Sequence, residues 1–169
     1  MSGVRFEGLL YRALNPLYAL TPLSGEGAAR YGGRFNRVGR PAIYAALHPH
    51  TAIREANQIG TLQPTTLVAL KADIRPVFNA RDAAALAKYH MTADALGDPD
   101  WRRRMIRRQA VPTQDLSEAL IGDGFAAMIV PSFAAGAPDD ASNMVLWRWK
   151  PPAKASLTLV DDQNRLGPG

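Results

Sequence analysis

The pattern of apolar positions along the chain predicts short strands separated by short helices. Six apolar runs have the length of strands and are bounded by turn residues: 8–14, 41–47, 65–74, 125–130, 143–149 and 157–161. The predicted strands therefore gather towards the two ends of the chain. This layout favours an α+β fold, with mixed or antiparallel sheets flanked by short helices, over a regular alternation of strand and helix.

Helices are expected between these runs. Their expected ranges are 49–59, 81–90, 98–109 and 113–120. Pro49 suits the first turn of its helix, and Gly60 is a natural terminator. Thr113 is expected to cap the last helix, because a threonine hydroxyl can accept a hydrogen bond from a free backbone N–H of the first turn.

Length and composition fit one compact domain. The chain has 169 residues, 47% of them hydrophobic and 21% charged, and no cysteine, so we expect one domain over 1–169 with a loose tail at 163–169. No apolar run reaches the roughly 18 residues that cross a bilayer, and residues 1–10 lack the pattern of a secretory signal, so we expect a cytoplasmic protein. Without cysteine, disulfides and thiolate nucleophiles are excluded, and His48 and His50 alone predict no metal site.

The net charge of +5 is local. It equals the charge of five arginines in one expected helix, Arg102, Arg103, Arg104, Arg107 and Arg108. Apolar residues are interleaved with them: Trp101, Met105 and Ile106. We expect an amphipathic helix whose apolar side packs down and whose arginines face solvent or a partner. Contact with nucleic acid is the alternative.

Glu55 is the most informative single residue. On a helix over 49–59, it lies on the same side as Ala52, Ala56 and Ile59, so its carboxylate is expected to point inward. Because burial of an unpaired carboxylate is costly, Glu55 is expected to meet a cation or a donor, or to line a wet cavity. A structural ion pair and a functional carboxylate both fit this expectation.

Four other residues are candidates for binding, each with a structural alternative. Arg34 lies in a glycine-rich loop, 30–39, which suits an anion but is also a plain tight turn. Arg12, on the first predicted strand, is either an inward cation or an edge residue. Tyr44 is either a core residue or a ring on which a planar heterocycle stacks. Ser132 either anchors a ligand or caps a turn.

The order of these residues resembles the signature of a known family. The segments that carry the resemblance are Tyr11-Arg12, Gly32-Gly33-Arg34-Phe35-Asn36 with Gly39, Ile43-Tyr44-Ala45-Ala46, Ala52 with Glu55, Val130-Pro131-Ser132, and Asn143. Together they resemble the RES-domain family of bacterial toxins, named for arginine, glutamate and serine. Phe35 stands where many relatives have tryptophan, which keeps an aromatic ring in that position.

The resemblance implies a fold, a substrate and a partner. Family members are similar to ADP-ribosyltransferases in fold, consume NAD without a metal, and pair with an Xre-type helix-turn-helix antitoxin that covers the active site. Matched residue by residue, it implies a catalytic set of Glu55, Tyr44 and Arg34, and an NAD-binding set of Arg12, Gly33, Arg34, Tyr44, Ser132 and Asn143. In this hypothesis Glu55 stabilises a ribosyl cation, the two arginines hold the pyrophosphate, and Tyr44 stacks on nicotinamide.

Several functional questions stay open at this level. The acceptor of ADP-ribose is water, phosphate or a protein, for instance an enzyme of nucleotide biosynthesis, and we expect growth arrest in each case. We expect no direct contact with nucleic acid and none with a membrane. One alternative is a nucleic-acid-binding or ribonuclease toxin that uses the arginines of 102–108. Another is an interaction module in which Glu55 and Arg34 form only a buried ion pair.

Overall fold

A computed structural model describes residues 3–58 and 60–166. The strands in this part of the chain are β1 (Val4–Leu14), β2 (Ile43–Ala46), β3 (Thr66–Asn79), β4 (Ala127–Pro131), β5 (Ser142–Leu146) and β6 (Ala155–Leu159). They lie in the order β1-β2-β5-β4-β3-β6, and β1 also pairs with β3, so the first five close into a barrel. The pairing of β3 with β4 is parallel, whereas the other pairings are antiparallel.

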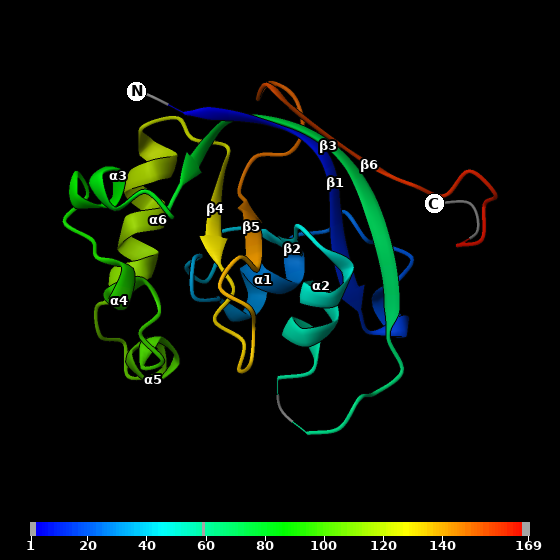
Figure 1. Cartoon of the computed structure of the whole chain (residues 1–169), viewed down its shortest axis with the longest axis horizontal. Coiled ribbons are helices and arrows are strands. Elements are labelled where there is room, and N and C mark those ends of the chain that lie inside the picture. Colours follow the sequence, from blue (N-terminus) through cyan, green and yellow to red (C-terminus); the bar gives the residue numbers. More distant parts are fainter. Residues whose placement is uncertain (1–2, 59, 167–169) are drawn as a thin grey trace.

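Short helices surround this barrel. They are the 3-10 turn Pro16–Tyr18 and α1 (Glu26–Tyr31), α2 (Pro49–Ala56), α3 (Ala83–Ala87), α4 (Ala93–Leu96), α5 (Trp101–Ile106) and α6 (Pro112–Gly122). Helices α3 to α6 gather on one side, beside β4, while the long ribbons of β1 and β3 arch over the other side (Figure 1). Helix α2 packs against β1 and also contacts β2 and β3. The mixed α+β expectation is therefore confirmed.

Alternation along the strands creates two apolar cores. Residues of β2, β3 and β5 that face the barrel interior, such as Ile43, Leu70 and Met144, form one cluster. The intervening residues face outward, and Val145 of β5 joins a second cluster with Leu120 of α6 and its neighbours. Because side chains alternate between the two faces of a strand, the same short strands fill the barrel and present a second face to the helices.

Two strands are longer than the sequence indicates. β1 begins at Val4 and β3 continues to Asn79, past Pro76. The two strands pair with each other along almost their whole length, with a shift in register between Val4 and Phe6. The pairing extends both strands: Val4 lies opposite Val77, and Phe6 lies opposite Ile74.

A helix lies within or across each of the four predicted ranges, but the helix ends differ from the prediction. Pro49 begins α2 as expected, but α2 ends at Ala56 with Asn57 as its C-cap, and the expected end at Ile59 lies outside the described residues. The cap prediction for Thr113 is wrong, because α6 begins at Pro112 and Val111 is its N-cap. Helices α1 and α4 were not predicted, since six and four residues are too few for a periodic pattern.

The arginine helix differs from its prediction on the apolar side. α5 covers only Trp101–Ile106, and the side chain of Ile106 is 72% exposed instead of packed. Arg103 forms a salt bridge with Asp100, and Arg104 Nε lies 3.7 Å from a carboxylate oxygen of Asp98. Two of the five positive charges are thus partly neutralised by the loop that precedes the helix.

At the C-terminal end, Asp161 holds the chain after β6. Its carboxylate accepts hydrogen bonds from the backbone N–H groups of Arg165 and Leu166, and Leu166 packs against the barrel cluster. The rest of the expected loose tail, 167–169, lies outside the described residues. None of the described helices has the length and apolar character needed to cross a bilayer.

Candidate active site

Two adjacent cavities share a wall made by Tyr44, Glu55 and Asn143. The smaller cavity, of about 300 Å³, is lined by Arg12. The larger one, of about 560 Å³, is lined by Arg34. Both sizes fall in the range of small-molecule sites or at its lower edge. Gly33 also lines the larger cavity, so the structure brings six of the predicted site residues to one pair of cavities.

Strand geometry places the wall residues. Tyr44 of β2 is paired with Val145 of β5, and Asn143 lies two residues before Val145. Cross-strand partners and residues two apart along a strand point to the same face of a sheet. Tyr44 and Asn143 therefore share the face opposite to Ile43 and Met144, which fill the barrel.

Glu55 reaches this face from α2 and is held by three donors. Its Oε1 accepts hydrogen bonds from Ser132 Oγ at 2.5 Å and from Asn143 Nδ2 at 2.7 Å, and its Oε2 accepts one from Gln58 Nε2 at 2.5 Å. The carboxylate is half-buried and lines both cavities. The expectation of donors and a cavity is confirmed, although Ala56, expected on the same inner side, is exposed.

The hypothesis of an ion pair between Glu55 and Arg34 is wrong for the described part of the chain. No salt bridge there joins the two side chains. Neutral donors hold Glu55, so its negative charge is not cancelled by a cation in direct contact. A carboxylate that is oriented but not paired can interact with positive charge on a ligand.

Ser132 and Asn143 owe their positions to the loop between β4 and β5. Ser132 directly follows β4, and Asn143 is the second residue of β5. Arg81 ties the end of this loop down, since its guanidinium donates to Ser142 Oγ at 2.8 Å and to the carbonyl of Ala141 at 2.6 Å. Asn143 Oδ1 is buried and accepts no hydrogen bond within the described chain, so it is available to a ligand donor in the cavities that Asn143 lines.

Arg12 is an inward cation that forms no salt bridge with a carboxylate of the described residues. Its Nη1 donates to the carbonyls of Pro22, at 2.6 Å, and Ser24, at 3.4 Å. Burial lowers the pKa of Arg12 to about 10. In the described structure no salt bridge or further hydrogen bond uses its Nε and Nη2, so the guanidinium keeps donors for an anion in the smaller cavity.

Arg34 lies between two aromatic rings at the larger cavity. Its Cζ is 4.9 Å from the ring centroid of Phe133 and 5.8 Å from that of Trp101. Nη1 donates to the carbonyl of Asp98 at 2.8 Å and to that of Leu96 at 3.4 Å. Burial lowers the pKa of Arg34, while the negative charges of Asp98 and Glu55 act in the opposite direction. The guanidinium is held rigidly without full neutralisation.

Tyr44 fixes the glycine-rich loop. Its hydroxyl accepts a hydrogen bond from the backbone N–H of Phe35 at 3.0 Å and donates one to Asn36 Oδ1 at 2.6 Å. Burial raises the pKa of Tyr44. A Cβ on Gly33 would come within 2.6 Å of both Tyr44 Oη and Asn36 Oδ1, so glycine is required for this close approach. The hydroxyl is committed to the loop, whereas the ring lines both cavities.

Some supporting residues were not found from the sequence. Thr113 donates to the carbonyl of Arg34 at 2.6 Å, and Gln114 donates to the carbonyl of Gly33 at 2.9 Å. Phe133 received no role, although its place directly after Ser132 gave a hint. Trp101 was expected on the packed, apolar side of the arginine helix, and its contact with Arg34 was not foreseen. None of these partners is near Arg34 in sequence, so no local pattern indicated them.

Within the described residues, no group of three histidine, cysteine, aspartate or glutamate side chains is placed to hold a metal ion. The chemical resources of the two cavities are an oriented carboxylate, two guanidinium groups, an aromatic ring and an amide. This set suits a ligand that combines negative charge with a hydroxyl-bearing group and a planar ring.

Comparisons with known proteins agree with this geometry. The model of the RES domain matches residues 9–166. The "Toxin Res" of Photorhabdus laumondii subsp. laumondii is 43% identical over 47 residues, which are 28% of this chain and 30% of that protein. The match therefore spans less than a third of the relative's length.

A solved structure shares the fold. The crystal structure of the M. tuberculosis MbcT-MbcA toxin-antitoxin complex contains a chain that matches with a TM-score of 0.62 and 22% identity. The match covers 94% of the present chain and 84% of that chain. At this level of identity the likeness concerns the fold alone.

Proposed function

Because the chain belongs to the RES domain family, we propose that it is the toxin of a bacterial toxin-antitoxin system and that it consumes NAD by breaking the bond between nicotinamide and ribose. The observation that carries this proposal is Glu55, an oriented carboxylate at the junction of two cavities that each contain a half-buried arginine. The names of the similar proteins, a toxin and a toxin-antitoxin complex, support the proposed role as a toxin. We also propose one domain, related in fold to ADP-ribosyltransferases and acting in the cytoplasm, where NAD is available.

The proposed reaction needs stabilisation of positive charge. When the bond between ribose C1′ and the pyridinium nitrogen breaks, the electron pair leaves with nicotinamide, which becomes neutral, and the ribose carries the positive charge. The carboxylate of Glu55 stabilises this cation electrostatically. The oxygen of the acceptor then bonds to C1′ and its proton is released to solvent. Ser132 and Asn143 keep the carboxylate in one orientation through their hydrogen bonds to Oε1.

Other residues of the two cavities bind the remaining parts of NAD. In the part of the chain that the structure describes, Arg12 and Arg34 each donate hydrogen bonds only through Nη1. Their other donors bind the pyrophosphate, because a guanidinium matches phosphate oxygens with two parallel hydrogen bonds. Tyr44 presents its ring to nicotinamide while its hydroxyl keeps the loop of Gly33 in place. Asn143 accepts a hydrogen bond from a ribose hydroxyl through its side-chain Oδ1. NAD is a substrate in this proposal, and no metal takes part.

An antitoxin of the Xre type is the proposed partner, and it covers the mouth of the larger cavity. Three exposed apolar residues are available to such a partner: Tyr31, which precedes the cavity residue Gly32 in the chain, Val38 and Ile106. Gly32, which lines the cavity, lies against Met105 and Val38. Exposed arginines of α5 adjoin this patch. An apolar and acidic protein surface would complement it.

The proposal is tested by incubating the purified chain with NAD, alone and with a bacterial lysate, and measuring nicotinamide release. We expect Glu55→Gln to lower the rate at least 100-fold, since electrostatic groups of this kind contribute about 10²–10³ in rate. The matched control is Glu7→Gln, which changes an exposed glutamate of β1 outside both cavities and leaves the rate unchanged. Full turnover by a folded Glu55→Gln protein contradicts the proposal.

The same experiment identifies the acceptor. Free ADP-ribose indicates hydrolysis, and a phosphorylated product indicates transfer to phosphate. When the NAD carries a label in its ADP-ribose part, transfer of that label to one lysate protein indicates mono-ADP-ribosylation. The proposal as a whole fails when a folded chain releases no nicotinamide in either condition.

A further inference from the structure

A third cavity, of about 630 Å³, lies at the opposite end of β4 and β5 from Glu55. Ala126, just before β4, and Trp147, just after β5, contribute to it, whereas Asn143 and Ser132 belong to the other ends of these strands. With five residues in each strand, the two ends are about 15 Å apart at roughly 3.3 Å per residue. The cavity is therefore separate from the candidate active site.

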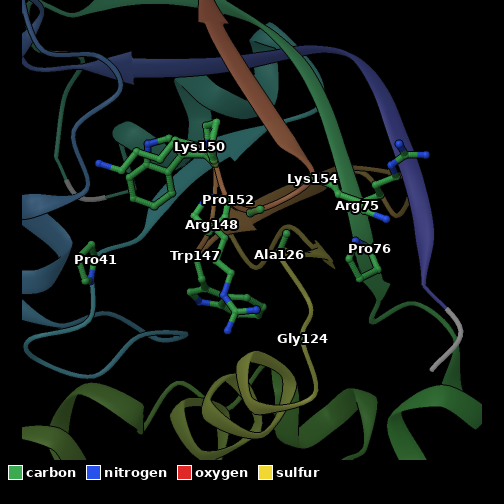
Figure 2. A pocket seen from close by; sticks show the side chains of 13 residues that line it. Pro41, Arg75, Pro76, Gly124, Ala126, Trp147, Arg148, Lys150, Pro152 and Lys154 are labelled. Atoms are coloured by element: carbon green, nitrogen blue, oxygen red, sulfur yellow. The ribbon is translucent and has the colours of Figure 1, made fainter.

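The floor of this third cavity is apolar and partly aromatic. Figure 2 shows Trp147, Pro76, Ala126 and Pro152 around one hollow, beside the chain that follows β5. The Trp147 indole N–H is already used by the carbonyl of Phe35, at 3.0 Å, so this residue offers the cavity its apolar ring. Rings of tryptophan and proline favour contact with a flat, apolar group.

The charged residues around the cavity all have one sign. They are Arg75, Arg148, Lys150 and Lys154, each exposed, and no aspartate or glutamate lines the cavity. None of the four takes part in a salt bridge among the described residues. Arg148 donates to the carbonyl of Ile121, which fixes its position without cancelling its charge. Positive potential thus surrounds an apolar hollow.

We propose that this third cavity binds a small organic anion with a flat apolar body. The apolar part packs on Trp147 and the prolines, and the anionic group is attracted by Lys150 and Lys154 at the rim. An uncharged flat molecule would gain only the first of these contributions, and inorganic phosphate only the second. The site does not depend on NAD chemistry, because it shares no lining residue with the two cavities of the candidate active site.

The test uses 8-anilinonaphthalene-1-sulfonate, a flat anion whose fluorescence rises in apolar surroundings, and measures its affinity and stoichiometry by titration. The uncharged probe N-phenyl-1-naphthylamine has the same rings without the sulfonate. The test variant is Lys150→Glu/Lys154→Glu. The control variant, Lys71→Glu/Lys88→Glu, changes the net charge equally through exposed lysines that do not line the cavity. Arg12→Gln serves as a control in the candidate active site.

We expect one sulfonate probe per chain, an affinity at least tenfold lower in Lys150→Glu/Lys154→Glu, and a change below twofold in the two controls. The uncharged probe should bind at least tenfold more weakly than the sulfonate. Equal binding of the two probes overturns the proposal, because charge then plays no part. An equal loss of affinity in Lys71→Glu/Lys88→Glu would show that the probe responds only to the net charge of the protein. A tenfold loss of affinity in Arg12→Gln would show that the probe binds in the candidate active site. Either result also overturns the proposal.

Discussion

At the scale of single residues, the two arginines of the candidate site are its most unusual feature. Arg12 and Arg34 are half-buried, and burial lowers the pKa of both, that of Arg12 to about 10. Backbone carbonyls orient each guanidinium, but no carboxylate within the described residues forms a salt bridge with either. Burial penalises their charged form, and a bound anion would relieve this penalty. Residues of this kind are more useful for binding than for stability.

Replacement of Arg12 tests this interpretation. We expect Arg12→Gln to weaken the binding of NAD or ADP-ribose at least tenfold, because charge-assisted hydrogen bonds contribute about 1.5–3 kcal/mol each. Isothermal titration calorimetry measures the affinity. Arg5→Gln is the matched control on the same strand, since Arg5 is bonded to Asp73 outside the cavities, and it should bind normally. Equal affinities for the two variants would refute a role of Arg12 in anion binding.

Gly33 gives a second prediction at this scale. A Cβ there would lie 2.6 Å from Tyr44 Oη and from Asn36 Oδ1, so Gly33→Ala should lower the free energy of unfolding by about 1–3 kcal/mol and reduce NAD turnover. Urea denaturation measures the first effect. Gly27→Ala in α1 has nothing within 4 Å of the added carbon and should be neutral or slightly stabilising. A Gly33→Ala protein as stable as Gly27→Ala would show that the loop can move aside.

At the scale of elements, the loop of residues 33–36 is held from several directions. Tyr44 of β2 bonds to Phe35 and Asn36, Trp147 after β5 donates to the Phe35 carbonyl, and α6 contributes Thr113. Asn36 is fully buried and donates to the carbonyl of Ala28 in α1. The loop is therefore a rigid platform for Arg34, although it contains little regular structure.

The contribution of α6 can be isolated. Thr113→Val keeps the shape of the side chain but removes the hydroxyl that donates to Arg34 O. We expect a loss of about 1–2 kcal/mol in the free energy of unfolding, because the carbonyl loses its bond in a buried place. We also expect a higher KM for NAD with a smaller change in kcat. Thr158→Val, at an exposed position of β6, should change neither quantity. An unchanged KM in Thr113→Val contradicts the platform role.

At the scale of the whole molecule, one barrel separates two ends with different chemistry. Around Glu55 the cavities carry a carboxylate between two arginines, and the opposite end carries only cations around an apolar floor. Closure of β1 onto β3 gives the short strands β2, β4 and β5 a packed interior, and the outer face of these strands packs against the helices and carries Tyr44 and Asn143 at the site.

A cellular experiment tests the proposed function of the whole molecule. Expression of the chain in a bacterial host without its partner should stop growth and lower cellular NAD at least severalfold, whereas Glu55→Gln at equal protein level should do neither. Cellular NAD is measured by an enzymatic cycling assay before and after induction. Growth arrest with normal NAD in both strains would speak against depletion and favour another toxic activity.

The sequence by itself determined the α+β class, most strands, the start of α2, the inward direction of Glu55 and the family. These follow from local patterns: alternation along strands, helical periodicity, and short motifs in a given order. Only the tertiary structure decided the ends of β1 and β3, the exposure of Ile106, the role of Thr113, and the aromatic contacts of Arg34. The reason is distance along the chain. Arg34 meets partners 62 to 99 residues away, and which side chains meet across such gaps depends on how the barrel closes, which no local pattern records.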